Sequence, residues 1–555
     1  MLITEKKQLK KYSTPYRVWQ GIASIEVTKK GRIFSTFYSG NIDEEIGNYV
    51  VLLKSDDGVN FTEPIAAVYK EGARCYDVCI WIDPLERLWL IWSVYPNHGV
   101  YGVICDNPDA DELEWGEEFF IGNDVMMNRP TVLSTGEWMF PISVWGERVW
   151  GWMPERRTSQ TELGAFVYKT VDKGKTFTKM GGITHPDNAY DEHMVLELND
   201  GRLMMLIRTM GGIGASYSYD RGKTWSEGVN SGFGGPGSRF HIRRLKSGRV
   251  LLINHCDYSY SKTNPQGRNN LMALLSDDDC KTWKYKLMLD ERDCVSYPDA
   301  TETEDGFIYV TYDRERGCGK KKIEDAYAEA REILYAKITE EDIMSGEIIN
   351  PDSKLKCVIS RLGKYEGKDD PFKAATRQKN EYAPYYASLE QDYALERIYR
   401  ILALDKRNFT KDEAAKFDGL IDSLDTAEDR VNVFAEIFTM LQYMPDREPI
   451  DLTEMVREEI LADLTRNTTA EDIIEKFGLS KHYFNYTFNK CTSISVEEYR
   501  DALRMTKAKK LLAEGAESIT EVSELSGYEG LSNFIEAFMK EERLSPSEYR
   551  EIMNK

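Results

Sequence analysis

Several charged and imidazole side chains stand at the ends of apolar runs, where a buried strand would reach solvent. They are Asp77 in RCYDVCIW, Arg129 in MMNRPTV, His241 in SRFHIRRL and Arg314 in YDRER. Carboxylate and guanidinium groups bind polar ligands through charged hydrogen bonds, and imidazole exchanges a proton near neutral pH. His241 and His193 are therefore candidates for acid/base chemistry. For each residue alone, a buried ion pair or a satisfied core hydrogen bond is an equally good interpretation.

The cysteines offer little metal chemistry. The nine thiols are scattered without a C-x-x-C pair, which favours reduced cysteines over a disulfide framework. Cys75 with Cys79, or Cys75 with His98, could be considered as metal ligands. That spacing is not specific, and buried free thiols are the simpler interpretation. We expect no metal and no cofactor.

Hairpins are the elements that would position the polar side chains. In the stretch 190–225, residues 194–198 alternate, Asn199-Asp200-Gly201 supplies a turn, and residues 203–207 form an apolar run. The same plan of apolar run, turn and apolar run recurs at 25–37, 80–92, 131–142, 242–254 and 301–311. The whole set makes about six such units, which favours the blades of a β-propeller.

An octapeptide accompanies several of these hairpins. Ser218–Trp225, SYDRGKTW, fits S-x-D-x-G-x-T-W, in which Asp220 accepts backbone N–H bonds and Gly222 takes a positive φ. Copies occur at 170–177 and 276–283, and a weaker one at 54–61. The pattern predicts equivalent hairpin turns at Asp57, Asp172, Asp220 and Asp278. A further copy is expected to have decayed near 105–115.

This octapeptide resembles the Asp box of the sialidase-like (BNR-repeat) propellers. The resemblance implies a six-bladed propeller and a site that grips a carboxylate with three arginines, for which Arg17, Arg208 and Arg268 are the candidates. It also implies Tyr297 as nucleophile and Glu192 as the base that deprotonates it, because a phenol is a poor nucleophile until its proton is removed.

The acid/base residue of such an enzyme would lie on the first-blade loop. Asp43 is the candidate there, with Glu44 and Glu45 as rivals, and this loop departs from the family pattern. The substrate-binding set is completed by the strand-end residues introduced above: Asp77, Arg129, His241 and Arg314. A sialic acid is the first ligand that the resemblance implies, and a uronic acid the second.

The last hundred residues carry a second pattern. Residues 470–490 and 519–540 each read as helix, turn, helix, and the amphipathic stretch 496–514 joins them. They resemble the DNA-binding domain of AraC/XylS-type transcriptional regulators, which implies a second helix of each unit in the major groove. The base-facing positions would be His482, Asn485 and Tyr486 in the first unit, and Ser532, Asn533 and Glu536 in the second.

The expected phosphate contacts are Arg504, Lys507, Lys509 and Lys510, with an ordinary solvated helix face as the alternative. The domain is acidic overall, whereas a DNA-binding domain is usually basic. We therefore expect weak binding by one copy, or a homodimer on two half-sites.

Composition limits the remaining possibilities. The net charge of −21 opposes non-specific attraction to nucleic acid or to an anionic membrane. No apolar run approaches a membrane span, and the N-terminus lacks the apolar core of a signal peptide. We expect a cytoplasmic protein with an acidic carbohydrate and double-stranded DNA as partners, and no membrane.

The predicted fold is a multi-domain β + α chain. Residues 1–355 form the six-bladed β-propeller, 356–450 a linker and helical spacer, and 451–555 an all-α tandem helix-turn-helix domain. Two functions remain open. In the first, the propeller binds, with or without hydrolysis, an acidic sugar and the C-terminal domain regulates transcription. In the second, the chain is a retaining exo-glycosidase whose DNA-binding domain is vestigial.

Overall fold

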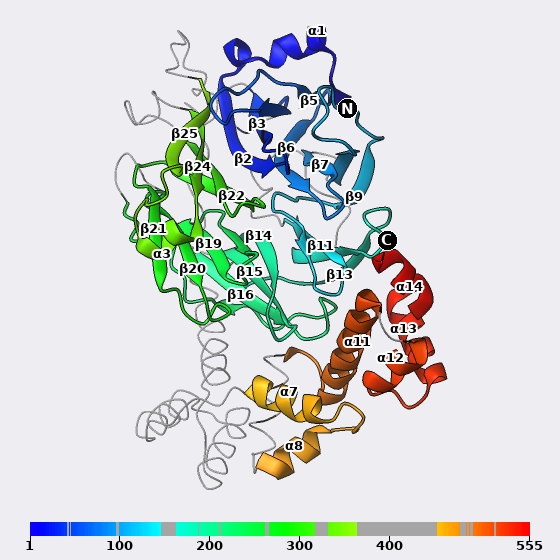
Figure 1. Cartoon of the computed structure of the whole chain (residues 1–555). Coiled ribbons are helices and arrows are strands. Elements are labelled where there is room, and N and C mark those ends of the chain that lie inside the picture. Colours follow the sequence, from blue (N-terminus) through cyan, green and yellow to red (C-terminus); the bar gives the residue numbers. More distant parts are fainter. Residues whose placement is uncertain are drawn as a thin grey trace, which may run out of the picture.

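The computed structural model describes most of the two predicted domains. The described residues are 1–40, 44, 46–95, 99–145, 163–186, 188–209, 212–260, 266–316, 331–362, 452–477, 484, 488, 492–515 and 518–554. They form a ring of six β-sheets with a group of helices packed against one side (Figure 1). The predicted β-propeller followed by an all-α domain is confirmed. The expected helical spacer lies almost entirely outside the described residues.

Each blade uses strands that are consecutive in the chain. Blade 1 contains β2 (Trp19–Val27), β3 (Ile33–Gly40), β4 (Tyr49–Ser55) and β5 (Ala66–Val68), and β1 (Leu2–Ile3) pairs with β5. Blade 2 contains β6 (Arg74–Ile82), β7 (Leu88–Tyr95), β8 (Gly99–Cys105) and β9 (Phe119–Asn123). Blade 3 contains β10 (Thr131–Val132), β11 (Trp138–Val144), β12 (Gly164–Thr170) and β13 (Thr178–Ile183). All neighbouring strands are antiparallel, as expected for hairpins joined by short turns.

The other three blades follow the same plan. Blade 4 contains β14 (Asn188–Glu197), β15 (Leu203–Thr209), β16 (Gly212–Ser218) and β17 (Val229–Asn230). Blade 5 contains β18 (His241–Arg244), β19 (Val250–His255), β20 (Leu271–Ser276) and β21 (Tyr285–Asp290). Blade 6 contains β22 (Val295–Glu302), β23 (Ile308–Arg314), β24 (Glu332–Ile338) and β25 (Lys354–Arg361). Helix α3 (Glu340–Ser345) stands between β24 and β25. Because β25 ends at Arg361, the last blade extends past the expected boundary at residue 355.

The first strand of each blade lies toward the axis. Strand β2 contacts both β6 and β22, so the first and last blades meet directly. Strands β2, β3, β6 and β7 are buried almost throughout, because neighbouring blades cover both of their faces. Where blade 1 meets blade 6, the side-chain amide of Gln20 donates to the carbonyl of Arg331 at 2.6 Å.

The four Asp boxes occupy equivalent turns between the third and fourth strands of their blades, as predicted. Asp220 accepts from Lys223 N at 3.1 Å, Thr224 N at 2.9 Å and Thr224 Oγ1 at 2.7 Å. In the first blade the box begins at Ser55, not at Lys54, because Ser55 Oγ bonds Asp57 and receives Gly58 N. That turn is one residue shorter than the others, which explains why its sequence matched the pattern poorly.

Three innermost strands carry a bulge at the same place. The register shifts between Gly21 and Ser24 in β2, between Tyr76 and Cys79 in β6, and between Ser296 and Asp299 in β22. The bulged residues Ile22, Asp77 and Tyr297 have φ of 56°, 45° and 55°. A bulge re-aims a side chain, and a positive φ at a branched or aromatic residue persists only where the surroundings enforce it.

The C-terminal domain consists of α7 (Leu452–Ala462), α8 (Ala470–Phe477), α11 (Val496–Glu514), α12 (Ile519–Leu525), α13 (Leu531–Glu542) and α14 (Pro546–Met553). Serines at 495, 518 and 545 form capping boxes at the starts of α11, α12 and α14. A short helix α1 (Lys6–Leu9) and two 3₁₀ turns, Lys10–Tyr12 and Thr14–Tyr16, precede the first blade. No described helix is long and apolar enough to cross a membrane.

Candidate functional site

Tyr297 lies at the centre of a buried polar group at one end of the propeller axis. Its hydroxyl accepts from Arg208 Nη1 at 2.8 Å, and the same Nη1 donates to Glu192 Oε1 at 2.7 Å. The tyrosine hydroxyl lies 3.5 Å from that carboxylate oxygen. Glu192 comes from β14, Arg208 from β15 and Tyr297 from β22, so two strands of blade 4 and the bulged strand of blade 6 build the group.

Two further arginines surround the same ring. The guanidinium carbon of Arg268 is 5.3 Å from the Tyr297 ring centroid and that of Arg316 is 4.2 Å from it. Arg268 and Arg208 both donate to the carbonyl of Gly237, at 3.0 and 2.6 Å. Arg316 follows β23 and forms ion pairs with Glu44 at 3.4 Å and Asp313 at 3.5 Å.

The electrostatics of this group favour a negatively charged ligand. Burial raises the pKa of Tyr297, and the three guanidinium groups only partly offset that effect, so the phenol is protonated at neutral pH. Burial also lowers the pKa of Arg268, and the like charges of Arg316 and Arg208 add to it. An anion beside Arg268 would relieve this repulsion, and a guanidinium fork matches a carboxylate.

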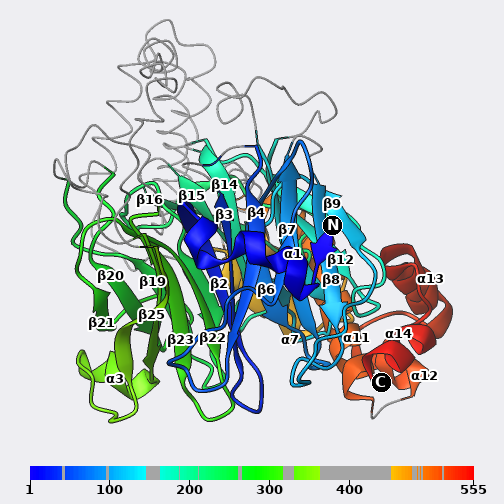
Figure 2. The same ribbon diagram turned by 90° about the horizontal axis from the view of Figure 1, so that it is seen from above.

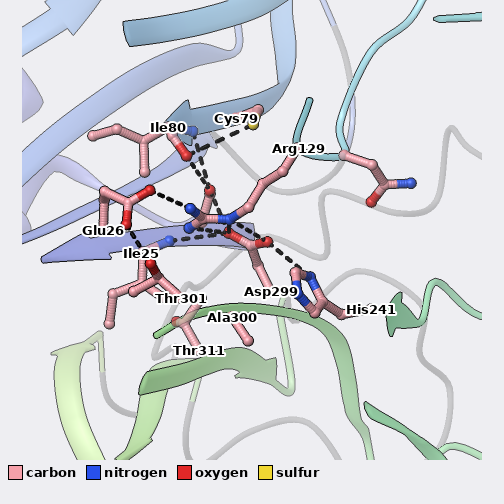
Figure 3. A network of polar contacts seen from close by, with 12 residues as sticks. Ile25, Glu26, Cys79, Ile80, Arg129, His241, Asp299, Ala300, Thr301 and Thr311 are labelled. Carbon is pink, nitrogen blue, oxygen red and sulfur yellow. Dashed lines mark hydrogen bonds and ion pairs between the residues drawn. The ribbon is translucent and has the colours of Figure 1, made fainter. Parts of the chain in front are cut away.

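A second polar network, here called the axial network, is centred on Asp299 (Figure 3). Arg129 donates to Asp299 Oδ1 at 3.0 Å and Oδ2 at 2.9 Å, and it also pairs with Glu26. His241 Nδ1 lies 3.2 Å from the same Asp299, which in turn receives Ser24 Oγ at 2.5 Å. Residues from four blades thus meet at one carboxylate.

This axial network is built for stability. Burial lowers the pKa of His241 to about 4, so its imidazole is neutral at physiological pH. Burial alone would raise the pKa of Asp299, but Arg129 outweighs it and holds that pKa well below its usual value. A cavity of about 620 Å³ opens beyond the network, with Glu26, Arg129 and His241 in its wall, and none of Tyr297, Glu192 and Arg208 lines it.

The C-terminal helices present one candidate reading face. At the start of α13, Ser532, Asn533 and Glu536 are exposed, while Phe534 and Phe538 turn into the core of the domain. This alternation is what a recognition helix requires, with polar side chains free on one face and apolar side chains fixing the other.

Comparison with known proteins agrees with both halves of this description. Residues 108–310 match the model of a BNR repeat-like domain, and residues 473–552 match that of a helix-turn-helix domain. The chain joins a BNR-repeat propeller to an AraC-type helix-turn-helix domain.

Individual relatives are similar over one domain at a time. A helix-turn-helix transcriptional regulator of Escherichia coli, YijO, is 31% identical over 99 residues, which cover 18% of this chain and 35% of that protein. The Msm operon regulatory protein of Streptococcus mutans is 33% identical over 100 residues, 18% of this chain and 36% of that protein. The chain thus spans about a third of the length of these curated relatives. The NanB sialidase structure from Streptococcus pneumoniae aligns with a TM-score of 0.42 and 13% identity over 54% of this chain and 66% of that one.

The BNR-repeat propeller brings together four of the five residues expected at its ligand site. Arg208, Arg268, Tyr297 and Glu192 converge as described above. Arg17 does not join them: its guanidinium bonds Thr14 Oγ1 at 2.8 Å and Ser360 Oγ at 3.0 Å and stacks over Phe37. The third arginine of the group is Arg316 in place of the expected Arg17; sequence reasoning named the nearby Arg314 as a further binding residue and missed Arg316. Arg314 instead pairs with Glu315 at 2.9 Å and Glu332 at 3.4 Å.

The acidic candidates of the propeller fall in different places. Asp43 and Glu45 lie outside the described residues, and Glu44 pairs with Arg74 at 3.0 Å as well as with Arg316. Asp77 is buried on its bulge, and burial raises its pKa to about 8 in spite of Arg74 nearby. A protonated carboxyl of this kind can donate a hydrogen bond or a proton to a ligand at neutral pH.

The remaining polar candidates have structural partners. Arg129 and His241 belong to the axial network, and Asp299 at its centre was missed although it lies two residues after Tyr297. His193 Nε2 lies 2.7 Å from the carbonyl of Phe166, deep in the blade packing. Cys75 and Cys79 are buried free thiols, and His98 lies outside the described residues.

In the helix-turn-helix domain, two of the four basic candidates are used internally. Arg504 Nε donates to the carbonyl of Leu464 at 2.7 Å, and Lys509 is 1% exposed within ion pairs. Lys507 is exposed and Lys510 half-buried. The first-unit positions His482, Asn485 and Tyr486 lie outside the described residues.

Proposed function

We propose that this protein is an AraC-type transcriptional regulator whose propeller binds an acidic sugar. The observation that carries the proposal is the convergence of Arg208, Arg268 and Arg316 around one buried tyrosine, Tyr297. The similarity of the C-terminal domain to helix-turn-helix regulators, with an exposed polar face on α13, supports DNA as the second partner.

The chemistry of the group selects the class of ligand. Arg208 and Arg268 both donate to the carbonyl of Gly237, so two guanidinium groups lie close enough together to act on one carboxylate, while Tyr297 and Glu192 suit hydroxyl groups of a sugar ring. Buried hydrogen-bonding groups of this kind discriminate strongly against ligands that leave them unpaired. A sialic acid is the first candidate and a uronate-containing glycan the second.

A second function is favoured by one distance. Glu192 lies 3.5 Å from the Tyr297 hydroxyl, within reach of the proton that a tyrosine nucleophile must lose. In a retaining glycosidase of this type, Glu192 accepts that proton as the tyrosine oxygen attacks the anomeric carbon, a separate acid protonates the aglycone oxygen as the glycosidic bond breaks, and water then releases the sugar from the tyrosine. Asp43 is the acid candidate from the sequence, and it lies outside the described residues.

Calorimetry on the full chain tests the ligand. N-acetylneuraminic acid and glucuronic acid are titrated, with glucose as the uncharged control, and each positive is then assayed for hydrolysis of its glycosides. Micromolar binding of an acidic sugar with no binding of glucose is expected. No heat from any acidic monosaccharide, at low salt and neutral pH, would remove the support for the proposal.

A further inference from the structure

The helix-turn-helix domain is docked on the turns of blades 3 and 4 (Figures 1 and 2). Tyr549 of α14 donates its hydroxyl to the carbonyl of Thr135 at 2.9 Å, and Arg457 of α7 donates to the carbonyl of Asp200 at 3.2 Å. Tyr219, the second residue of the blade-4 Asp box, packs edge-on against Tyr499 with ring centroids 5.3 Å apart. Hairpin turns and an Asp box thus act as a docking surface.

A buried ion cluster joins the two domains. Lys509 of α11 pairs with Glu137 of blade 3 at 3.1 Å, and Lys169 of blade 3 pairs with Glu542 of α13 at 2.8 Å. The side chains of Lys509, Glu137 and Glu542 are 1%, 0% and 0% exposed. Arg221, in the blade-4 box, pairs with the same Glu137 at 3.2 Å.

The charges of this cluster depend on docking. Burial alone would lower the pKa of Lys509, but the carboxylates of Glu542 and Glu137 outweigh it and raise that pKa. Burial would raise the pKa of Glu137, but Arg221 and Lys509 hold it well below its usual value. Removing one partner of a buried pair leaves an uncompensated charge, so the cluster specifies one docked arrangement.

The docking surface and the candidate ligand site share one hairpin. Strands β14 and β15 carry Glu192 and Arg208 at the end nearest Tyr297. At the other end, Glu197 pairs with Arg221 at 3.5 Å, and the carbonyl of the turn residue Asp200 accepts a hydrogen bond from Arg457. Glu192 and Glu197 are five residues apart on one strand, or roughly 17 Å. Backbone pairing of β14 with β15 runs without interruption from His193 to Glu197, and Glu192 lies in the register shift that directly precedes it. This paired segment is the connection between the two ends.

We propose that the propeller and the helix-turn-helix domain act as one docked unit, in which ligand occupancy at Arg208 and Glu192 is passed to the DNA-binding domain through the β14–β15 hairpin. The coupling rests on the proposed ligand-binding function, whereas the docking does not. The exposed face of α13, with Asn533 and Glu536, lies outside the docking contacts. Ligand therefore changes the orientation or rigidity of the reading helices and does not uncover them.

Hydrogen exchange of the full chain tests docking and coupling without a ligand. Lys509→Met keeps the length and packing of the side chain but removes its charge, and Lys507→Met is the matched control on the exposed face of the same helix. Lys509→Met is expected to speed exchange about tenfold in the turns at 135–137 and 219–223 and, through the hairpin, at 203–209. Lys507→Met should leave all three segments unchanged.

A milder variant distinguishes local loss of docking from unfolding of the whole helix-turn-helix domain. Tyr549→Phe removes only the hydroxyl that reaches Thr135 and keeps the ring in its apolar cluster. It should produce the same pattern at smaller amplitude, with the melting transition of the propeller unchanged. Unchanged exchange at 135–137 and 219–223 in both variants would overturn the docking. Faster exchange there with no change at 203–209 would overturn the coupling.

DNA binding with and without N-acetylneuraminic acid then measures the coupling directly. We expect the acidic sugar to change the Kd for the chain's own upstream DNA about 5- to 100-fold in the wild type. In Lys509→Met that ratio should fall to about one, while Lys476→Met, at an exposed lysine of α8 that pairs with Glu459, should retain it. A wild type that binds no acidic sugar refutes the proposed function, and the exchange of 135–137 and 219–223 still decides the docking. A wild-type ratio that survives in Lys509→Met refutes the hairpin route.

Discussion

Arg268→Met separates a binding role from a structural role, because the two roles predict different effects on stability. Arg268 is buried near two other arginines. Since their guanidinium carbons lie 5.3 and 4.2 Å from one ring centroid, Arg268 and Arg316 are no more than about 9.5 Å apart. At an effective dielectric constant near 20, two unit charges at that separation repel by about 2 kcal/mol.

The substitution also removes a stabilising contact. The bond from Arg268 to the carbonyl of Gly237, at 3.0 Å, contributes about 1 kcal/mol. Relief of the repulsion therefore offsets the loss, and we expect the free energy of unfolding without ligand to change by no more than about 1 kcal/mol. Ligand binding should instead weaken by roughly 2–5 kcal/mol, because a charged partner of the carboxylate is lost.

Chemical denaturation and calorimetry check the two effects on the same samples. Arg292→Met is the matched control: Arg292 pairs with buried Asp290 at 2.6 Å, away from Tyr297, so its loss should lower stability and leave the sugar affinity unchanged. If Arg268→Met unfolds more easily than the wild type and binds the acidic sugar equally well, Arg268 is a structural residue and the ligand site is wrong.

Four further outcomes are expected. Tyr297→Phe should retain sugar binding and, if the wild type hydrolyses a glycoside, should lose nearly all turnover; a fully active variant would exclude a tyrosine nucleophile. Asp77→Asn should make the free energy of unfolding less dependent on pH between about 4 and 8. Its carboxyl has a folded pKa of about 8, above the unfolded value, so deprotonation destabilises the wild type as pH rises through that window; a denaturation series with equal slopes for both proteins would contradict this. Asp220→Ala should lower stability by on the order of 2–4 kcal/mol in thermal melts, because two backbone N–H groups and two hydroxyls lose their acceptor; an unchanged melt would show that the turn does not need the carboxylate. Asn533→Ala should cost about 1–3 kcal/mol at one base position in a fluorescence anisotropy titration, and equal losses on every sequence would mark a phosphate contact instead.

The repeat of hairpins and Asp boxes was sufficient to predict the propeller, because both patterns are local and recur. Tyr297 and Glu192 followed from the family resemblance. The third arginine did not. Arg314 and Arg316 are two residues apart and would share one face of a regular strand, but β23 ends at Arg314 and the positive φ of Glu315, 52°, redirects the chain before Arg316. Arg17 stands where the resemblance placed the first arginine, but it precedes β2 and its side chain turns to Ser360.

The docking interface could not be predicted from the sequence. Its contacts join turns and helices that are hundreds of residues apart, and each charged residue alone resembles an ordinary surface residue. The structure nevertheless explains part of the acidic composition of the C-terminal domain. Glu542 and its neighbour Glu541 neutralise Lys509 and two lysines of the propeller, Lys169 and Lys223. These carboxylates therefore do not repel DNA as free charges would.

The route of the chain through the ring has a consequence for assembly. The last blade ends at Arg361, on the side of the propeller away from α11–α14, and the next described helix, α7, begins at Leu452 (Figure 1). Residues 363–451 connect the two points. The docking contacts would be identical if the helices came from a second chain, so two copies that exchange their C-terminal domains would form the same interface twice. Such an exchanged pair would present two helix-turn-helix domains to DNA without any contact that the single chain does not already make.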